Sequence, residues 1–141
     1  MAVEIIRPAT AFALSPGGRK KRARLHDDNY LDFIRGLPSC LTGERPVDAA
    51  HVRYGDLRYG KRETGAGEKP DDLWTLPLTR RQHEQQHGMD ERAFWARHGI
   101  DPLALCTKLF ACNQDYERAE LVIADAIRTA STFLGRPVEE R

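Results

Sequence analysis

The sequence has little cysteine, and it has no long apolar run. Its three cysteines are an odd number without paired spacing, which argues against a disulfide framework. No segment approaches the roughly 20 consecutive apolar residues that a membrane span needs. The N-terminal residues lack a basic start followed by an apolar stretch, so we expect no signal peptide. These absences predict a cytoplasmic protein that does not enter a membrane.

Excess charge of one sign is also lacking. The 141 residues carry a formal net charge of +1, with 40% hydrophobic and 30% charged residues, which predicts a soluble domain with a modest core. Basic residues nevertheless cluster within segments 19–24, 53–69 and 80–81. This distribution favours a basic face suited to phosphate contact, although segment 19–24 is equally well explained as a solvated tail.

Breakers and capping residues divide the chain into three parts. We expect an N-terminal arm over 1–25 with a short strand near 3–6, a domain over 26–103, and a helical extension over 104–141. Capping signals predict a helix that begins at Asp27 or Asp28 and runs through Ile34, helices over 79–87 and 90–98, one from Asp101 onward, and a last one after Asn113. Strands are expected over 47–54 and 73–78, joined by a long polar loop. The predicted class is α+β.

The last predicted helix has a repeating apolar face. Apolar residues recur there at helical spacing from Ala119 to Phe133, so one face should be packed. Packing against its own domain is favoured over the alternative, a surface for a homodimer or another partner.

Three histidines suggest chemistry. His83 and His87 lie four residues apart, on one face of a predicted helix, and His-x3-His is a known way to hold a divalent ion. The third histidine, His51, lies at the end of a predicted strand. Taken alone, the helix pair could be solvated surface and His51 could be a structural histidine. Together they suit metal-assisted phosphodiester hydrolysis, with one imidazole as the base and Arg53 and Arg80 gripping phosphates.

A series of short motifs carries a resemblance to a known superfamily. In order they are PSCLTG (38–43), DAAHVR (48–53), KPDDLWTLPL (69–78), HEQQH (83–87) and ERAFW (91–95). Over roughly residues 26–103, this series resembles the HNH or His-Me finger endonucleases, in particular phage and prophage nucleases of the recombination-enhancement type. The resemblance implies a ββα-metal finger, a β-hairpin with a long loop followed by a helix, surrounded by several α-helices.

The resemblance also implies roles for individual residues. His51 would be the general base, and Asp72 would occupy the place of a middle polar residue that orients the base. His83 and His87 would hold the single metal ion, with Asp71 as a further ligand. The expected phosphate contacts are Arg53, Lys69, Arg80 and Arg81. The products would be a 5′-phosphate and a 3′-hydroxyl.

Two departures from the superfamily pattern affect metal binding. Ala50 stands where many relatives have a metal ligand immediately before the base. Either the metal has fewer protein ligands, or one of Asp48, Asp71 and Asp72 substitutes for the missing one. Alternatively, His51 is itself a ligand and another group is the base. Many relatives also hold a structural zinc with four cysteines. Of the matching positions here, only Cys40 is a cysteine; the others are Gly43, Thr79 and Gln82, so we expect no structural zinc.

The sequence thus predicts a metal-dependent endonuclease that cuts DNA with low sequence specificity, in phage DNA processing or recombination. The expected cofactor is one divalent ion, Mg²⁺ or Mn²⁺ in function, with Zn²⁺ or Ni²⁺ able to occupy the site in a crystal. A recombination protein is a candidate partner. The alternative is a nucleic-acid-binding module that keeps the fold but has lost catalysis.

Overall fold

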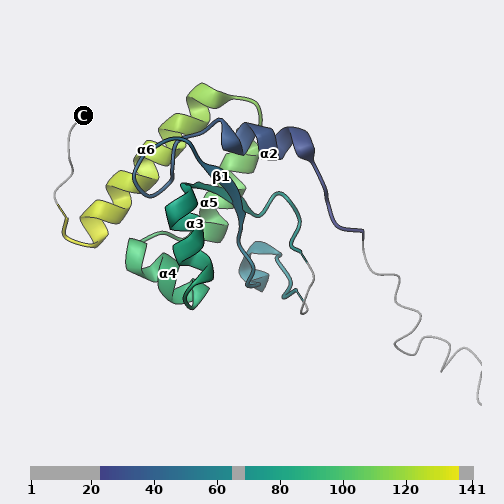
Figure 1. The fold of residues 1–141 in the computed structure, drawn as a ribbon, viewed down its shortest axis with the longest axis horizontal. Coiled ribbons are helices and arrows are strands. Elements are labelled where there is room, and N and C mark those ends of the chain that lie inside the picture. The colour runs from purple at the N-terminus through teal and green to yellow at the C-terminus, as the bar shows by residue number, and fades with distance from the viewer. Residues whose placement is uncertain (1–22, 65–68, 137–141) are drawn as a thin grey trace, which may run out of the picture.

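A computed structural model describes residues 23–64 and 69–136. The strand expected near 3–6 and the basic residues 19–22 lie outside the described residues. Figure 1 shows helices around a small sheet, which confirms the α+β class. The elements are α2 (Asp28–Arg35), β1 (Asp48–His51), the 3-10 helix η1 (Leu57–Tyr59), β2 (Thr75–Leu78), α3 (Arg80–His87), α4 (Glu91–His98), α5 (Pro102–Ala111) and α6 (Tyr116–Phe133).

The sheet is an antiparallel pair in which His51 lies opposite Thr75 and Asp48 lies opposite Leu78. Both strands are shorter than predicted, although Val52 N still donates to Trp74 O at 2.8 Å. The next amide, Arg53 N, donates to the Glu91 carboxylate instead of to the other strand. The ladder ends here because Trp74 N donates to Asp71 O at 3.0 Å rather than back to Val52 O, while Arg53 N points away from β2.

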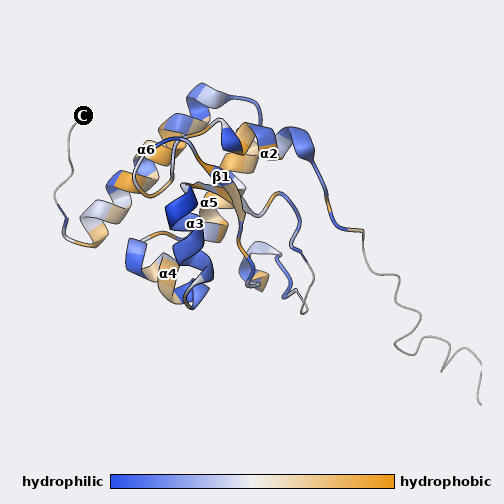
Figure 2. Cartoon of the chain, in the orientation of Figure 1, coloured by the Kyte–Doolittle hydropathy of each residue, from blue (hydrophilic) through white to orange (hydrophobic). Residues whose placement is uncertain are grey.

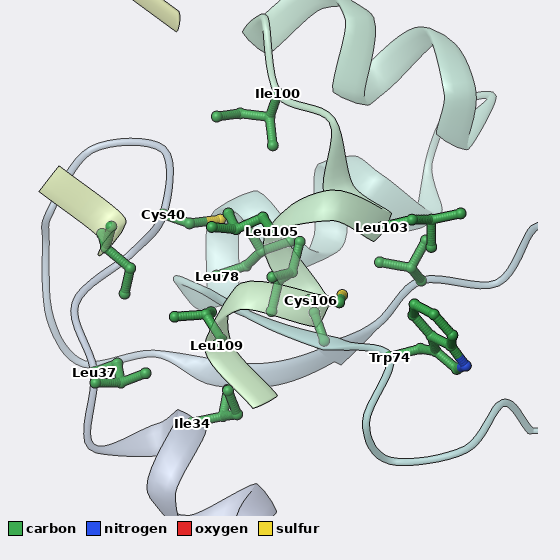
Figure 3. Packing of buried hydrophobic residues seen from close by; sticks show 14 of the residues in the cluster. Ile34, Leu37, Cys40, Trp74, Leu78, Ile100, Leu103, Leu105, Cys106 and Leu109 are labelled. Carbon is green, nitrogen blue, oxygen red and sulfur yellow. The ribbon is translucent and has the colours of Figure 1, made fainter. Parts of the chain in front are cut away.

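The core lies against β2, all four residues of which are buried. Because side chains alternate along a strand, burial of all four means that both faces of β2 are covered. In Figure 3, Leu105, Cys106 and Leu109 of α5 lie beside Leu78 and Ile34. Of the aromatic residues and cysteines, Trp74, Phe94, Trp95, Cys40, Cys106 and Cys112 are all buried.

Helix α6 packs against its own domain, as predicted, through Ala119, Ile123 and Ala130. The prediction was wrong for Phe133, which is 78% exposed. Leu134, the next residue, packs against the domain instead, beside Gly99. Gly99 leaves room for it because a Cβ at this position would lie only 3.1 Å from Leu134 Cγ. Over residues 23–64 and 69–136, no helix is both long and apolar enough to cross a membrane.

Helix α3 is polar on every side, with the sequence RRQHEQQH, and Figure 2 draws it blue. Its buried side chains are Gln82 and Gln86, so hydrogen bonds must replace apolar packing. Gln82 completes the predicted capping box with Thr79, and its Oε1 also accepts from Ser39 Oγ at 2.6 Å. Its Nε2 donates to Thr42 Oγ1 at 3.1 Å. These bonds join the 39–42 turn to the start of α3.

Replacing Gln82 with Met should lower the free energy of unfolding by about 1–3 kcal/mol, because buried donors at Ser39 and Thr79 lose their acceptor. Urea denaturation of the purified full chain measures this change. Gln85→Met, at an exposed position of the same helix, is the matched control and should stay within about 0.5 kcal/mol of the parent. Equal stability of the two variants would contradict the structural role of Gln82.

Candidate functional site

Strand β1 presents candidate residues on its two faces. Side chains alternate along a strand, so Asp48 and Ala50 point to one face and His51 points to the other. Asp48 contacts α3, whereas His51 reaches the loop before β2. The candidate site therefore has two parts, held by the same short strand.

The first part is a pair between His51 and Asp72. His51 Nε2 lies 2.8 Å from Asp72 Oδ1, and the Asp72 side chain is fully buried. A carboxylate can only accept, so Nε2 carries the proton and Nδ1 has the free lone pair. Burial lowers the pKa of His51, Asp72 opposes this shift, and the charges of Arg24 and Lys69 add to it. The net result is a ring that is neutral at neutral pH and able to accept a proton at Nδ1.

Asp72 also binds the segment before α2, residues 24–27, which we call the N-terminal strap. Oδ1 accepts from Arg24 Nη2 at 2.6 Å in addition to His51. Oδ2 accepts from Asp27 N at 2.8 Å and lies 2.9 Å from His26 Nδ1. Burial alone would raise the pKa of Asp72, but hydrogen bonds from Asp27, His51 and Arg24 outweigh it and lower the pKa. Asp72 is therefore held as a carboxylate by donors from the strap and from β1.

The strap is held by main-chain contacts as well. Arg24 Nε donates to Pro70 O at 2.9 Å, Leu25 N donates to Asp71 Oδ1 at 2.8 Å, and Asp72 N donates to Leu25 O at 2.9 Å. Asp71, expected as a metal ligand, is thus engaged with the strap. Among the described residues, no hydrogen bond or ion pair joins Asp71 to His83 or His87.

The second part is the pair His83 and His87 on α3, whose Nε2 atoms lie 3.0 Å apart. At this distance His87 Nε2–H donates a hydrogen bond to His83 Nε2. Two nitrogens bound to one ion at about 2.0–2.1 Å are also roughly 3 Å apart, so an ion that displaced this proton would meet both nitrogens. His83 Nδ1 lies 3.1 Å from Asp48 Oδ2, which must accept its proton. That bond leaves the His83 Nε2 lone pair directed at His87. Asp48 therefore orients a candidate ligand, as outer carboxylates do at metal sites.

A third protein ligand is not assembled in the described part of the chain. No group of three or more His, Cys, Asp or Glu side chains is arranged there to hold a metal. Ala50, on the same face as Asp48, is fully buried and offers no donor. An ion on the two imidazoles would take its other ligands from water and substrate oxygens, as in open catalytic sites.

Hydrogen bonds hold the two parts together. Gln86, the neighbour of His87, donates from Nε2 to His51 O at 3.0 Å and to Glu91 Oε1 at 3.3 Å. Glu91 in turn accepts from Arg53 N at 3.0 Å. The end of β1 is thus fixed to α3 and α4, which places the His51 main chain beside the turn of α3 that carries His87.

The four expected phosphate contacts are all exposed. After burial, the charge of Arg53 is the next cause that lowers the pKa of His87, and Lys69 acts on His51. Arg80 Nε pairs with Asp48 Oδ2 at 3.2 Å, while Arg81 lies on the exposed side of α3. Arg53 and Lys69 thus act on His87 and His51 through their charge, whereas Arg80 pairs directly with the carboxylate that contacts His83.

Sequence reasoning missed other members of the site. Arg24 and His26, which contact Asp72, were given no role in the site, because they lie on either side of the boundary expected between the arm and the domain. The buried Lys61, whose Nζ donates to Arg53 O at 3.3 Å, lay in a segment assigned to a polar loop. The sequence carries no local signal for the contacts of Arg24 and His26 with Asp72, because they join segments far apart along the chain.

Asp72→Asn should lower the free energy of unfolding at pH 7 by about 3 kcal/mol, because an amide cannot accept from all four donors. The native pKa of Asp72 is depressed, so its stabilising effect is present above the unfolded value of about 3.9 and is lost as pH falls through the native pKa. The difference from the parent should therefore shrink below about pH 4. Urea denaturation at several pH values measures it, with the exposed Asp32→Asn as control; a gap that does not change with pH would contradict this prediction.

Comparison with known proteins identifies one family. The family model described as protein of unknown function (DUF968) matches residues 7–114, which is more than half of the chain. No curated protein matches the sequence, and no solved structure does either. The matched region contains both parts of the candidate site, His51 with Asp72 and His83 with His87, as well as the N-terminal strap and Asp48. The chain belongs to the DUF968 family.

Proposed function

We propose that this protein is a metal-dependent endonuclease that hydrolyses DNA phosphodiester bonds with His51 as the general base. Two features of the hairpin and the following helix carry the proposal. A neutral His51 is bound to the buried Asp72 carboxylate, and the Nε2 atoms of His83 and His87 lie 3.0 Å apart on α3. In this proposal β1, β2 and α3 form a ββα-metal finger of the HNH type.

His51 would remove a proton from the attacking water at Nδ1, since Nε2 is bound to Asp72. Asp72 keeps the ring in that tautomer and offsets the positive charge that the ring acquires. The water oxygen would attack phosphorus and the 3′-oxygen would leave, giving a 5′-phosphate and a 3′-hydroxyl. The depressed pKa of His51 suits this role, because the base must be unprotonated at the working pH.

His83 and His87 would hold the metal ion, with Asp48 fixing the orientation of His83. When bound, the ion would offset charge on the phosphate oxygens and the departing 3′-oxygen. Mg²⁺ or Mn²⁺ is the proposed functional ion, and the imidazoles would also accept Zn²⁺ or Ni²⁺. Donation from only two protein side chains leaves several coordination positions for substrate and water.

Substrate binding would rest on the cations around the two parts. Arg53, Lys69, Arg80 and Arg81 are exposed and suited to phosphate contact, which does not depend on base sequence. We therefore propose low sequence specificity, and a role in phage DNA processing or recombination, alone or with a recombination protein. Homodimerisation through the C-terminal helix remains a prediction.

A second candidate function is nucleic-acid binding without catalysis. It is favoured by Ala50, which removes one expected ligand, and by the lack of a three-ligand group among residues 23–64 and 69–136. Such a module would bind DNA with a steep salt dependence and would not cut it.

The nuclease proposal is tested with supercoiled plasmid in EDTA, Mg²⁺ or Mn²⁺. The parent should nick DNA only with metal, and His51→Ala should lower the rate by at least about 100-fold. The rate should rise with pH through a pKa below the ordinary histidine value of about 6.5, because neutral His51 is the active form. His98→Gln, outside the site, should match the parent.

Each outcome has a distinct meaning. Equal cutting by the parent and His51→Ala would remove His51 as the base. Folded protein that binds DNA in a salt-dependent way but never nicks it would favour the binding module.

Metal binding is tested separately by titration calorimetry with Mn²⁺ and Ni²⁺. The parent should bind one ion, and His83→Ala with His87→Ala should abolish binding, because both nitrogens of the chelate are lost. Asp48→Asn should weaken binding about tenfold through loss of the outer carboxylate. Unchanged binding by the double variant would place the metal elsewhere.

A further inference from the structure

The N-terminal strap reaches the proposed base through one buried carboxylate. We propose that Arg24 is a positioning residue for His51, acting through Asp72 to hold the imidazole with Nε2 protonated and Nδ1 free. The inference rests on the proposed function, in which His51 is the base. It assigns a role to a residue outside the hairpin and the helix that hold the proposed chemistry.

Arg24 and His51 share one oxygen atom. Arg24 Nη2 lies 2.6 Å from Asp72 Oδ1, and His51 Nε2 lies 2.8 Å from the same oxygen. The guanidinium also donates from Nε to Pro70 O at 2.9 Å. Because the guanidinium group is planar and rigid, these two bonds fix the carboxylate relative to the main chain two residues before it. The acceptor for His51 is therefore set by Arg24 as well as by the loop.

The other oxygen of Asp72 restrains the plane of the carboxylate. Asp27 N and His26 Nδ1 both lie within hydrogen-bond distance of Oδ2. With each oxygen contacted by two groups, the carboxylate cannot rotate without breaking a bond in a buried position. Removing Arg24 leaves His51 as the remaining partner of Oδ1, and the carboxylate can then turn toward the Oδ2 side. The ring of His51 would lose its fixed acceptor and populate both tautomers.

The Arg24 side chain is 32% exposed, whereas Asp72 is fully buried. The guanidinium thus covers the carboxylate on the side that faces solvent. This arrangement distinguishes Arg24 from the expected phosphate contacts, which are exposed and not bound to Asp72. We expect Arg24 to affect the chemical step more than the binding of DNA.

The test compares Arg24→Met and Arg24→Lys with the parent in two measurements. The first is the ¹⁵N chemical shifts of the His51 ring in the metal-free full chain, which report the tautomer without any need for activity. The second is kcat and KM for plasmid nicking. The parent should show the Nε2-protonated tautomer, and Arg24→Met should show a mixture. In Arg24→Met, kcat should fall by roughly tenfold to a hundredfold with KM unchanged.

Rescue and control variants sharpen the result. Arg24→Lys keeps a charged donor and should recover most of the tautomer preference and of kcat. Arg35→Met removes one positive charge from an exposed arginine of α2, which pairs with Asp32, and should change neither measurement. Circular dichroism establishes that each variant is folded; if Arg24→Met is not, Arg24→Gln, which retains a donor amide, is compared with Arg24→Lys in its place.

The opposite results are equally specific. An unchanged His51 tautomer and an unchanged kcat in folded Arg24→Met would overturn the proposal. A rise in KM alone would also overturn it and make Arg24 a DNA contact. The two proposals can also fail separately. If Arg24→Met changes the His51 tautomer but the parent never cuts DNA, the positioning role is supported and the proposed nuclease function is refuted.

Discussion

A carboxylate removed from water must be given hydrogen-bond donors, and Asp72 receives them from two separate parts of the chain. Arg24, His26 and the amide of Asp27 come from the strap, and His51 comes from β1. One buried side chain therefore fixes the N-terminal strap, the loop before β2 and the end of β1 relative to each other. The proposed base owes its tautomer to this single constraint, and the segment before α2 becomes part of the site.

The same rule explains how a wholly polar helix is attached to the sheet. Helix α3 offers no apolar side chain, so Gln82 and Gln86 bind the 39–42 turn and the end of β1 through hydrogen bonds. Because Gln82 and Gln86 are the buried side chains that attach α3, His83 and His87 are not needed to hold the helix on the sheet. Both proposed parts of the site consequently sit on secondary structure that buried polar bonds hold in place, which suits groups that must keep a fixed geometry.

The proposed HNH-type site would have a reduced set of donors. Ala50 contributes nothing, and Asp71 is engaged by Leu25. Asp48 binds the Nδ1 side of His83 and leaves Nε2 facing His87. In the proposed enzyme the substrate would complete the coordination of the ion, so metal binding and DNA binding would strengthen each other. Gln82 joins the turn at Ser39 and Thr42 to α3.

The sequence by itself determined the features that depend on neighbouring residues. Capping by Asp27, Asp90 and Asp101, the Thr79–Gln82 capping box, and the placement of His83 and His87 on one face of a helix all follow from spacing along the chain. Only the tertiary structure decided that Arg24 and His26 bind Asp72, that Asp71 binds the strap, and that Asp48 orients His83. These contacts join residues from 35 to 48 positions apart, so they depend on how the elements pack rather than on any local preference of the backbone.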